Sequence, residues 1–168
     1  ALAPGNKDAL ALLANLELID GKNDKALEAI NKAIAGAPED DRLYLIKGRV
    51  LVANKQYADA ETTLKKTLEL NSKKISNYAG LVAFYLERDE NGKARELLSQ
   101  MTTVFPDSSQ PYLQMAAVDL RENKVEAAEQ HFSKALEVDP KNTKLKMAIA
   151  DFYSKNGKFE KAEELYKS

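Results

Sequence analysis

Residues 109–142 read SQPYLQMAAVDLRENKVEAAEQHFSKALEVDPKN. Two apolar patterns of helical period stand in this stretch, and the polar residues ENK separate them. Tyr112 and Ala116 belong to the first pattern, and Phe132 and Ala135 belong to the second. The second pattern stops before Pro140, because the residue that precedes a proline is biased away from helical conformation. We therefore expect two antiparallel helices joined by a tight turn.

This stretch is one copy of a unit that recurs every 34 residues. Alanine keeps that interval at five places: Ala26, Ala60, Ala94, Ala128 and Ala162. Proline follows a second set with the same interval, at Pro4, Pro38, Pro106 and Pro140, and Ser72 stands at the vacant place. Short segments rich in glycine and asparagine, DGKN, ANKQ, DENG and KNGK, break the apolar patterns at matching points. The chain is therefore predicted to be an array of helix pairs.

The unit resembles the tetratricopeptide repeat, a helix–turn–helix of 34 residues with small residues at positions eight, twenty and twenty-seven. The resemblance divides the chain into repeats 7–40, 41–74, 75–108 and 109–142 and a partial repeat 143–168, preceded by the end of another repeat at 1–6. It departs from the family pattern at position eleven, where Glu17 and Asp119 replace an aromatic residue, and at position twenty-seven, where Thr67 and Met101 replace alanine. The resemblance implies an all-α, right-handed superhelical solenoid of antiparallel helix pairs, with residues 1–168 as one array.

Small and large residues at fixed positions have distinct expected roles. The small ones lie where neighbouring helices pass closest, because a larger side chain would push the helices apart. The large ones at position ten are expected to connect adjacent repeats, so that stability is a sum over neighbouring units. They are Leu16, Val50, Phe84, Val118 and Phe152.

Composition excludes several classes of function. The chain of 168 residues has a net charge of −1, no cysteine and no apolar run that could cross a bilayer. Basic and acidic residues alternate closely, so neither nucleic acid nor membrane insertion is expected. His131 is the only histidine, and it is expected to be exposed or to serve in packing. We predict no catalytic, metal-binding or cofactor-binding residues, and no enzyme.

Function is expected to reside on surfaces. The resemblance implies a concave groove lined by the first helix of each repeat, with an apolar stripe from positions five and twelve and polar residues at its ends. Arg42 and Arg49 are expected to meet an acidic group there. No lysine occupies position five, so the Lys and Asn clamp with which some relatives hold a C-terminal carboxylate is absent. The candidate partner-binding residues are Asn15, Leu18, Arg42, Leu45, Arg49, Val52, Ala79, Leu86, Leu113, Leu120, Met147 and Asp151.

Two functions follow from these observations. The first is a non-catalytic protein–protein interaction scaffold that binds a peptide or helix of a partner in the groove. The alternative is a structural spacer or self-assembly segment of a longer repeat protein, with end-to-end self-association through its helical ends. The opening residues ALAPGN read as the end of a helix, so the chain is expected to be part of a longer array. The residue usage suggests a bacterial source, and the compartment, cytoplasmic or periplasmic, is left open.

Overall fold

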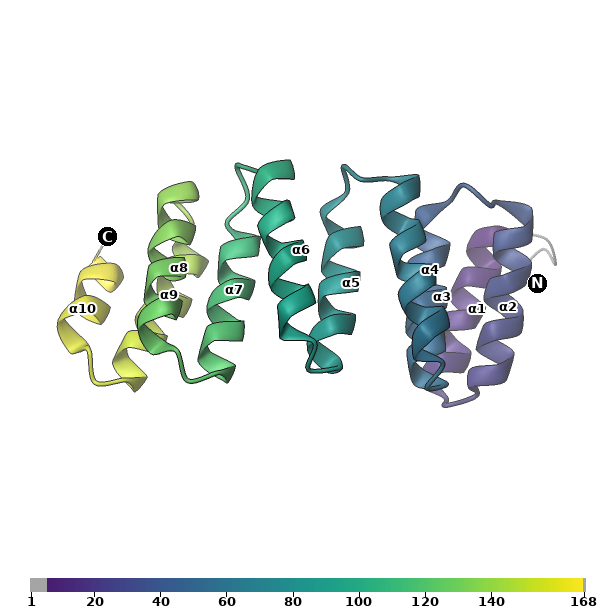
Figure 1. Ribbon diagram of the computed structural model, residues 1–168, viewed down its shortest axis with the longest axis horizontal. Coiled ribbons are helices and arrows are strands. Elements are labelled where there is room, and N and C mark those ends of the chain that lie inside the picture. Colours follow the sequence, from purple (N-terminus) through teal and green to yellow (C-terminus); the bar gives the residue numbers. More distant parts are fainter. Residues whose placement is uncertain (1–5, 168) are drawn as a thin grey trace. The chain divides into compact units, whose positions relative to one another are not determined.

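The computed structural model describes residues 6–167, which form ten α-helices and no strands (Figure 1). The expectation placed on ALAPGN rests mainly on residues 1–5, which lie outside the described residues. The helices are α1 (Lys7–Ile19), α2 (Asn23–Gly36), α3 (Asp41–Ala53), α4 (Tyr57–Leu70), α5 (Ile75–Glu87), α6 (Asn91–Val104), α7 (Gln110–Arg121), α8 (Val125–Val138), α9 (Thr143–Lys155) and α10 (Phe159–Lys167). None of the described helices is both long and apolar enough to cross a membrane.

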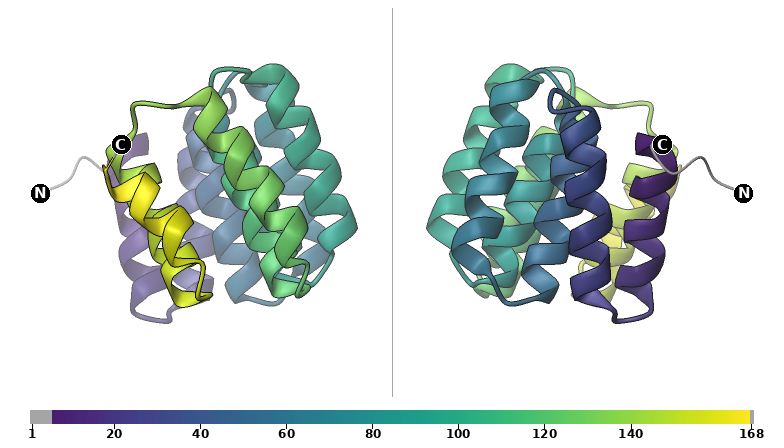
Figure 2. Two further views of the ribbon diagram at one scale, coloured as in Figure 1. Left: turned by 90° about the vertical axis from the view of Figure 1, so that its left-hand side faces the viewer. Right: turned by 90° about the vertical axis from the view of Figure 1, so that its right-hand side faces the viewer.

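The helices follow the predicted repeat. The first helix of each predicted pair packs against the second in α1/α2, α3/α4, α7/α8 and α9/α10. The two further views show the same succession of helix, short turn and helix (Figure 2). The chain forms two compact units, unit 1 at residues 1–94 and unit 2 at residues 95–168, and the division falls within α6. The chain is thus an all-α helical-repeat solenoid.

Every turn inside a helix pair has three residues, and its middle residue has a positive φ. These residues keep the interval of 34 and are Gly21, Lys55, Asp89, Asn123 and Gly157, with φ between 55° and 73°. Only two of the five are glycine, the residue that adopts this left-handed conformation at the least cost. The turn is therefore set by the repeat as a whole and not by glycine alone.

Backbone hydrogen bonds close each of these turns in the same way. In the first pair, Lys22 N donates to Glu17 O at 2.8 Å and Gly21 N donates to Leu18 O at 3.1 Å. The same two bonds recur at every turn, where the carbonyl of position eleven accepts the first and the carbonyl of position twelve accepts the second. This is the Schellman arrangement, which satisfies carbonyls left over at a helix end. Because the backbone of position eleven makes the bond, the side chain there is free to vary.

Small residues fill the closest approaches in unit 1. Ala14, Ala26, Ala33 and Ala60 are fully buried, as the repeat pattern predicts. One core cluster joins side chains of α1, α2 and α3. Thr67, the departure at position twenty-seven, is also fully buried, and its hydroxyl donates to Leu64 O at 2.6 Å. The polar atom is therefore satisfied within its own helix.

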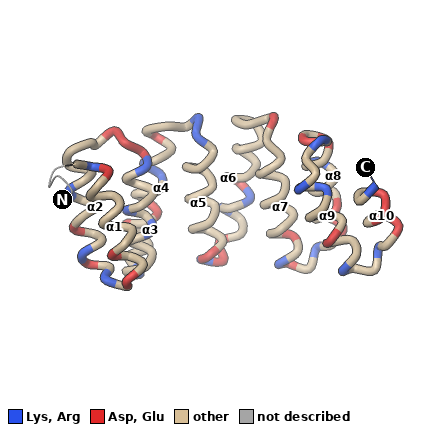
Figure 3. The backbone as a smooth tube through the Cα atoms, turned by 180° about the vertical axis from the view of Figure 1, so that it is seen from behind, with Lys and Arg blue, Asp and Glu red and all other residues tan. Residues whose placement is uncertain are grey.

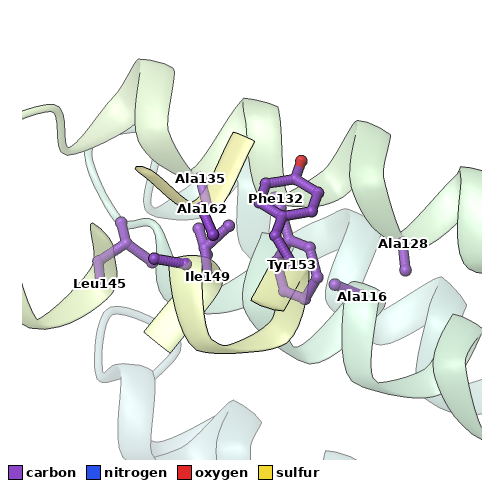
Figure 4. Packing of buried hydrophobic residues seen from close by; sticks show 9 residues of the cluster. Ala116, Ala128, Phe132, Ala135, Leu145, Ile149, Tyr153 and Ala162 are labelled. Atoms are coloured by element: carbon purple, nitrogen blue, oxygen red, sulfur yellow. The ribbon is translucent and has the colours of Figure 1, made fainter. Parts of the chain in front are cut away.

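Unit 2 has an aromatic core, shown in Figure 4. Its cluster draws side chains from α7, α8, α9 and α10, with Phe132 from α8 and Tyr153 from α9 among the largest. The rings of Phe132 and Phe152 lie 4.9 Å apart at their centroids, in a tilted arrangement that favours aromatic packing. Ala128 and Ala162, two of the regularly spaced alanines, are buried in the same cluster.

Position ten is buried in three repeats, half-buried at Phe152 and exposed in the first repeat. Val50 and Val118 are fully buried and Phe84 is nearly so. Leu16 is 53% exposed, and Leu12 and Ile19 of the same helix are 52% and 80% exposed. The expectation that Leu16 connects adjacent repeats is therefore wrong for the described residues, because no described helix packs on that face.

Candidate functional site

A hollow of about 720 Å³ opens on unit 1, and we call it the unit 1 groove. Helices α3 and α5 supply most of its walls, and Leu18 from α1 closes one side. The volume lies within the range of roughly 300–1,000 Å³ that is typical of ligand sites. The lining residues are Leu18, Arg42, Leu45, Ile46, Gly48, Arg49, Val52, Ala53, Leu64, Ser76, Gly80, Ala83, Phe84 and Glu87.

Two glycines let the helices that form the unit 1 groove pack closely. A Cβ atom on Gly80 would lie 2.7 Å from Leu45 Cδ2, so the absence of a side chain lets Leu45 lie against α5. A Cβ atom on Gly48 would lie 2.5 Å from Leu64 Cδ2 and 2.7 Å from Leu64 Cγ. Both leucines line the groove, but Leu64 is buried, whereas Leu45 is half-buried. The two glycines therefore differ in how tightly their neighbouring leucine is enclosed.

Arg42 is already committed to partners inside unit 1. Its Nη2 lies 2.7 Å from Asp40 Oδ2 and 3.2 Å from Asp8 Oδ1. The hydrogen bonds from Arg42, together with one from Lys7, hold the pKa of Asp40 well below its usual range. Asp40 also caps α3 by accepting from Arg42 N at 3.2 Å. Within unit 1 the guanidinium of Arg42 is thus paired with two carboxylates, and the expectation that Arg42 meets an acidic group of a partner stays a prediction.

Arg49 and Glu87 are the other charged residues of the unit 1 groove. Both are exposed, and neither makes a hydrogen bond or ion pair with another of the residues that the structure describes. Arg49 lies on α3 and Glu87 lies on α5. The groove lining thus carries charges of both signs. Basic and acidic residues are likewise interspersed along the described backbone (Figure 3).

The other predicted groove residues of unit 1 lie outside this lining. Asn15 Nδ2 donates to Ala11 O at 3.1 Å, which turns the amide back onto its own helix. Ala79 and Leu86 are half-buried on α5 but do not line the groove.

In unit 2 the four predicted residues differ in their surroundings. Leu113 and Leu120 are half-buried and pack against the aromatic core cluster. Met147 is 52% exposed on α9. Asp151 accepts a hydrogen bond from Tyr166 at 2.5 Å, so its carboxylate is already engaged. Five of the predicted residues line the unit 1 groove, namely Leu18, Arg42, Leu45, Arg49 and Val52.

The candidate list omitted two lining residues that matter for the geometry, Gly80 and Glu87. Glu87 stands at position thirteen of its repeat, a groove position of the family pattern, so the register alone could have identified it. Gly80 is a lone glycine inside a helical pattern, which usually marks a close approach of two helices. Its partner Leu45 could not be assigned without the packing of α3 on α5.

Unit 2 contains a buried ionic cluster that joins α6, α7 and α8. Asp119 has a side chain only 2% exposed, and its two oxygens lie 2.7 Å from Arg95 Nη2 and 2.7 Å from His131 Nδ1. Arg95 also contacts Glu122 Oε2 at 2.9 Å, and Lys124 contacts the same oxygen at 2.7 Å. Hydrogen bonds from Lys124 and Arg95 lower the pKa of Glu122 to about 2.

This cluster gives His131 a role that its sequence context did not reveal. We expected an exposed or packing residue, and the structure places the imidazole against a buried carboxylate. Among the described residues, no group of three or more His, Cys, Asp or Glu side chains is arranged to hold a metal ion. The arrangement is that of a buried ion pair extended by a histidine, which fixes α7 against α8.

The regular helix pairs and the apolar groove define a class of protein, the helical-repeat scaffolds. The family model described as tetratricopeptide repeat matches residues 17–83 and 119–168, more than half of the chain. The chain belongs to the tetratricopeptide repeat family. A second model, described as suppressor of forked protein (Suf), matches residues 59–139.

Curated relatives share this repeat over nearly the whole chain. Anaphase-promoting complex subunit 3 of Schizosaccharomyces pombe is 23% identical over 97% of the chain, and BBSome complex member BBS4 of Bos taurus is 25% identical over 99%. The chain spans 19% and 32% of the lengths of these relatives.

Solved structures show the same fold at low identity. PilF of Pseudomonas aeruginosa is 20% identical, with a TM-score of 0.69 over 96% of this chain and 73% of that one. MamA is 19% identical, with a TM-score of 0.62 over 92% of this chain and 91% of that one. YrrB, described as a TPR protein with an unusual peptide-binding site, is 19% identical, with a TM-score of 0.55 over 93% of this chain and 80% of that one. Proteins of this family are typically non-catalytic, and the fold implies a protein–protein interaction scaffold.

Proposed function

We propose that this chain is a non-catalytic scaffold that binds a peptide or helical segment of a partner protein in the unit 1 groove. The observation that carries the proposal is the hollow of about 720 Å³, whose floor includes Leu45, Val52 and Phe84. A large apolar hollow with a few polar groups at its edge is the usual form of a site that accepts side chains of a peptide. The repeats 7–40 to 109–142 and the partial repeat 143–168 would serve as one array that presents this surface.

Two further points support the proposal. Both named curated relatives are described as parts of multi-protein complexes, and YrrB is described as having a peptide-binding site. The groove also keeps Arg49 without a partner among the described residues, which leaves one strong donor for a ligand. Nucleic acid fits less well, because Glu87 and an apolar floor line the same space.

Selection of peptides from a random library on the purified protein tests the proposal. The affinity of the selected peptides is then measured for the variant Val52→Glu, which places a charge on the groove floor, and for Val104→Glu as a matched control. Val104 is 40% exposed on α6 and does not line the groove. Circular dichroism and thermal unfolding establish that both variants remain folded.

We expect the peptides to bind the parent and Val104→Glu equally and to lose about tenfold or more in affinity on Val52→Glu, because binding would bury the new charge. Equal binding to all three proteins would place the binding surface elsewhere. A library that yields no binders would favour the spacer function.

A further inference from the structure

Arg49 and Glu87 are opposite charges that line one groove without joining each other. Each is exposed, and no hydrogen bond or ion pair links either of them to another described residue. The third charged residue of the lining, Arg42, differs from them because it forms ion pairs with Asp40 and Asp8. The unit 1 groove therefore presents one available cation on α3 and one available anion on α5.

The surface between these helices is apolar. Leu45 and Val52 come from α3, and Phe84 comes from α5. An apolar side chain that covers this floor displaces water from it, and each square ångström of apolar surface removed from water stabilises the complex by about 25 cal/mol. The same occupant also partly removes water from Arg49 and Glu87, so an occupant without complementary charges would leave both less well solvated.

The inference that follows rests on the proposed function and specifies its ligand. We propose that the unit 1 groove takes a peptide segment in which a large apolar side chain stands between an acidic and a basic residue, with the carboxylate at Arg49 and the cation at Glu87. Because the two charges lie on different helices, such a segment crosses α3 and α5, and its charge order fixes its direction. The planar guanidinium of Arg49 suits a carboxylate through two parallel hydrogen bonds.

Gly80 sets the depth of the floor under the apolar side chain. It lets Leu45 lie against α5, because a Cβ there would come within 2.7 Å of Leu45 Cδ2. The change Gly80→Ala would displace the end of a flexible, half-buried side chain toward the open groove. We expect this change to weaken binding of the apolar side chain while the charge preference stays as it was.

Fluorescent peptides of defined charge order test the inference. One peptide carries Glu before and Lys after a central leucine, the second carries the reverse order, and the third carries Gln at both places, each made with two spacings. They are titrated against the parent protein and against the exchange Arg49→Glu/Glu87→Arg. The matched control is the exchange Glu28→Lys/Lys32→Glu on α2, which reverses an exposed ion pair away from the groove.

We expect the parent to prefer one charge order over the Gln peptide by roughly two- to fivefold, the range for ion pairs at an exposed rim. The Arg49→Glu/Glu87→Arg protein should prefer the opposite order, and the control should match the parent. Reversal of the preference is a result that a general loss of stability would not produce.

Two other outcomes overturn the inference in different ways. Binding that ignores peptide charge and is lost on Val52→Glu would refute the charge pattern while the proposed groove function stands. If no peptide binds the parent more tightly than it binds Val52→Glu, both the charge pattern and the proposed function are refuted.

Discussion

The two units place a carboxylate at the same repeat position and accommodate it differently. At position eleven, Asp119 of unit 2 is buried between Arg95 and His131. Glu17 of unit 1 has a side chain 20% exposed, and its nearest cation, Lys22, is 3.8 Å from Oε2, an atom without a hydrogen bond. Position eleven thus holds one carboxylate that is paired on both oxygens and one whose Oε2 is buried with only a distant cation beside it.

The backbone explains why both solutions fit one fold. Lys22 N donates to Glu17 O at 2.8 Å, and Lys124 N donates to Asp119 O at the same distance. The turn that ends each first helix is therefore closed whichever side chain is present. In unit 2 the side chain at this position is part of a buried ionic cluster. In unit 1 the charged residues without a partner, Arg49 and Glu87, line the groove instead.

The largest expected effect comes from Asp119→Ala. The change leaves Arg95 and His131 without the carboxylate that holds them, and since both are partly exposed the cost should be about 2–3 kcal/mol, below the 3–5 of a fully buried pair. Glu17→Ala should change the free energy of unfolding by about 0.5 kcal/mol or less, because that side chain has no close partner. Urea denaturation of both variants measures the difference.

A combined change separates the loss of a pair from the loss of packing. Asp119→Leu with Arg95→Met and His131→Leu should recover most of the lost stability, because apolar groups of similar volume often replace a buried ionic cluster without cost. Equal destabilisation by Asp119→Ala and Glu17→Ala would contradict the comparison between the units.

Gly48→Ala should have the next largest effect. The new methyl group would lie 2.5 Å from Leu64 Cδ2 and 2.7 Å from Leu64 Cγ, and Leu64 is buried, so overpacking should cost about 1–3 kcal/mol. Gly80→Ala is the matched control, since its methyl group comes close only to the mobile end of Leu45, with Leu64 Cδ2 at an ordinary contact distance of 3.8 Å, and alanine favours the helix by about 1 kcal/mol. Thermal unfolding should lower the midpoint for the first variant only, and a similar loss in both would show that the groove side of α5 is as tightly packed as the core.

The sequence predicted the fold through its small residues. Regular alanines such as Ala26 and Ala128 are buried as expected, because close helix packing favours small side chains. What the sequence could not reveal depends on contacts between residues far apart in the chain. The pairing of Arg42 with Asp8 and the burial of Asp119 beside His131 are examples, since neither follows from helical period.

Acid should weaken both units through carboxylates whose pKa is lower in the folded state. Lys124 and Arg95 lower the pKa of Glu122 to about 2 from 4.5, and Arg42 lowers that of Asp40 from 3.8. The unfolded chain then binds more protons as pH falls, so this stabilisation is present above about pH 4.5 and is lost toward pH 2.

Urea midpoints measured at several values between about pH 6 and pH 2.5 check this expectation. Glu122→Gln should flatten the pH dependence that comes from unit 2, and Asp40→Asn should flatten the part from unit 1. A midpoint that is constant over this range in the parent would contradict the role given to both carboxylates.

The smallest expected effect comes from the turns, where unit 1 places Lys55 and unit 2 places Asn123 in the left-handed conformation, with φ of 60° and 57°. Lysine is strained there, so Lys55→Gly should stabilise the protein by about 0.5–1 kcal/mol after the greater freedom of glycine in the unfolded chain is included. Asn123→Gly should gain less, because asparagine already tolerates this conformation. Differential scanning calorimetry compares the unfolding temperatures of the two variants. A loss of stability in Lys55→Gly would mean that contacts of the lysine side chain stabilise the protein by more than the backbone strain at Lys55 destabilises it.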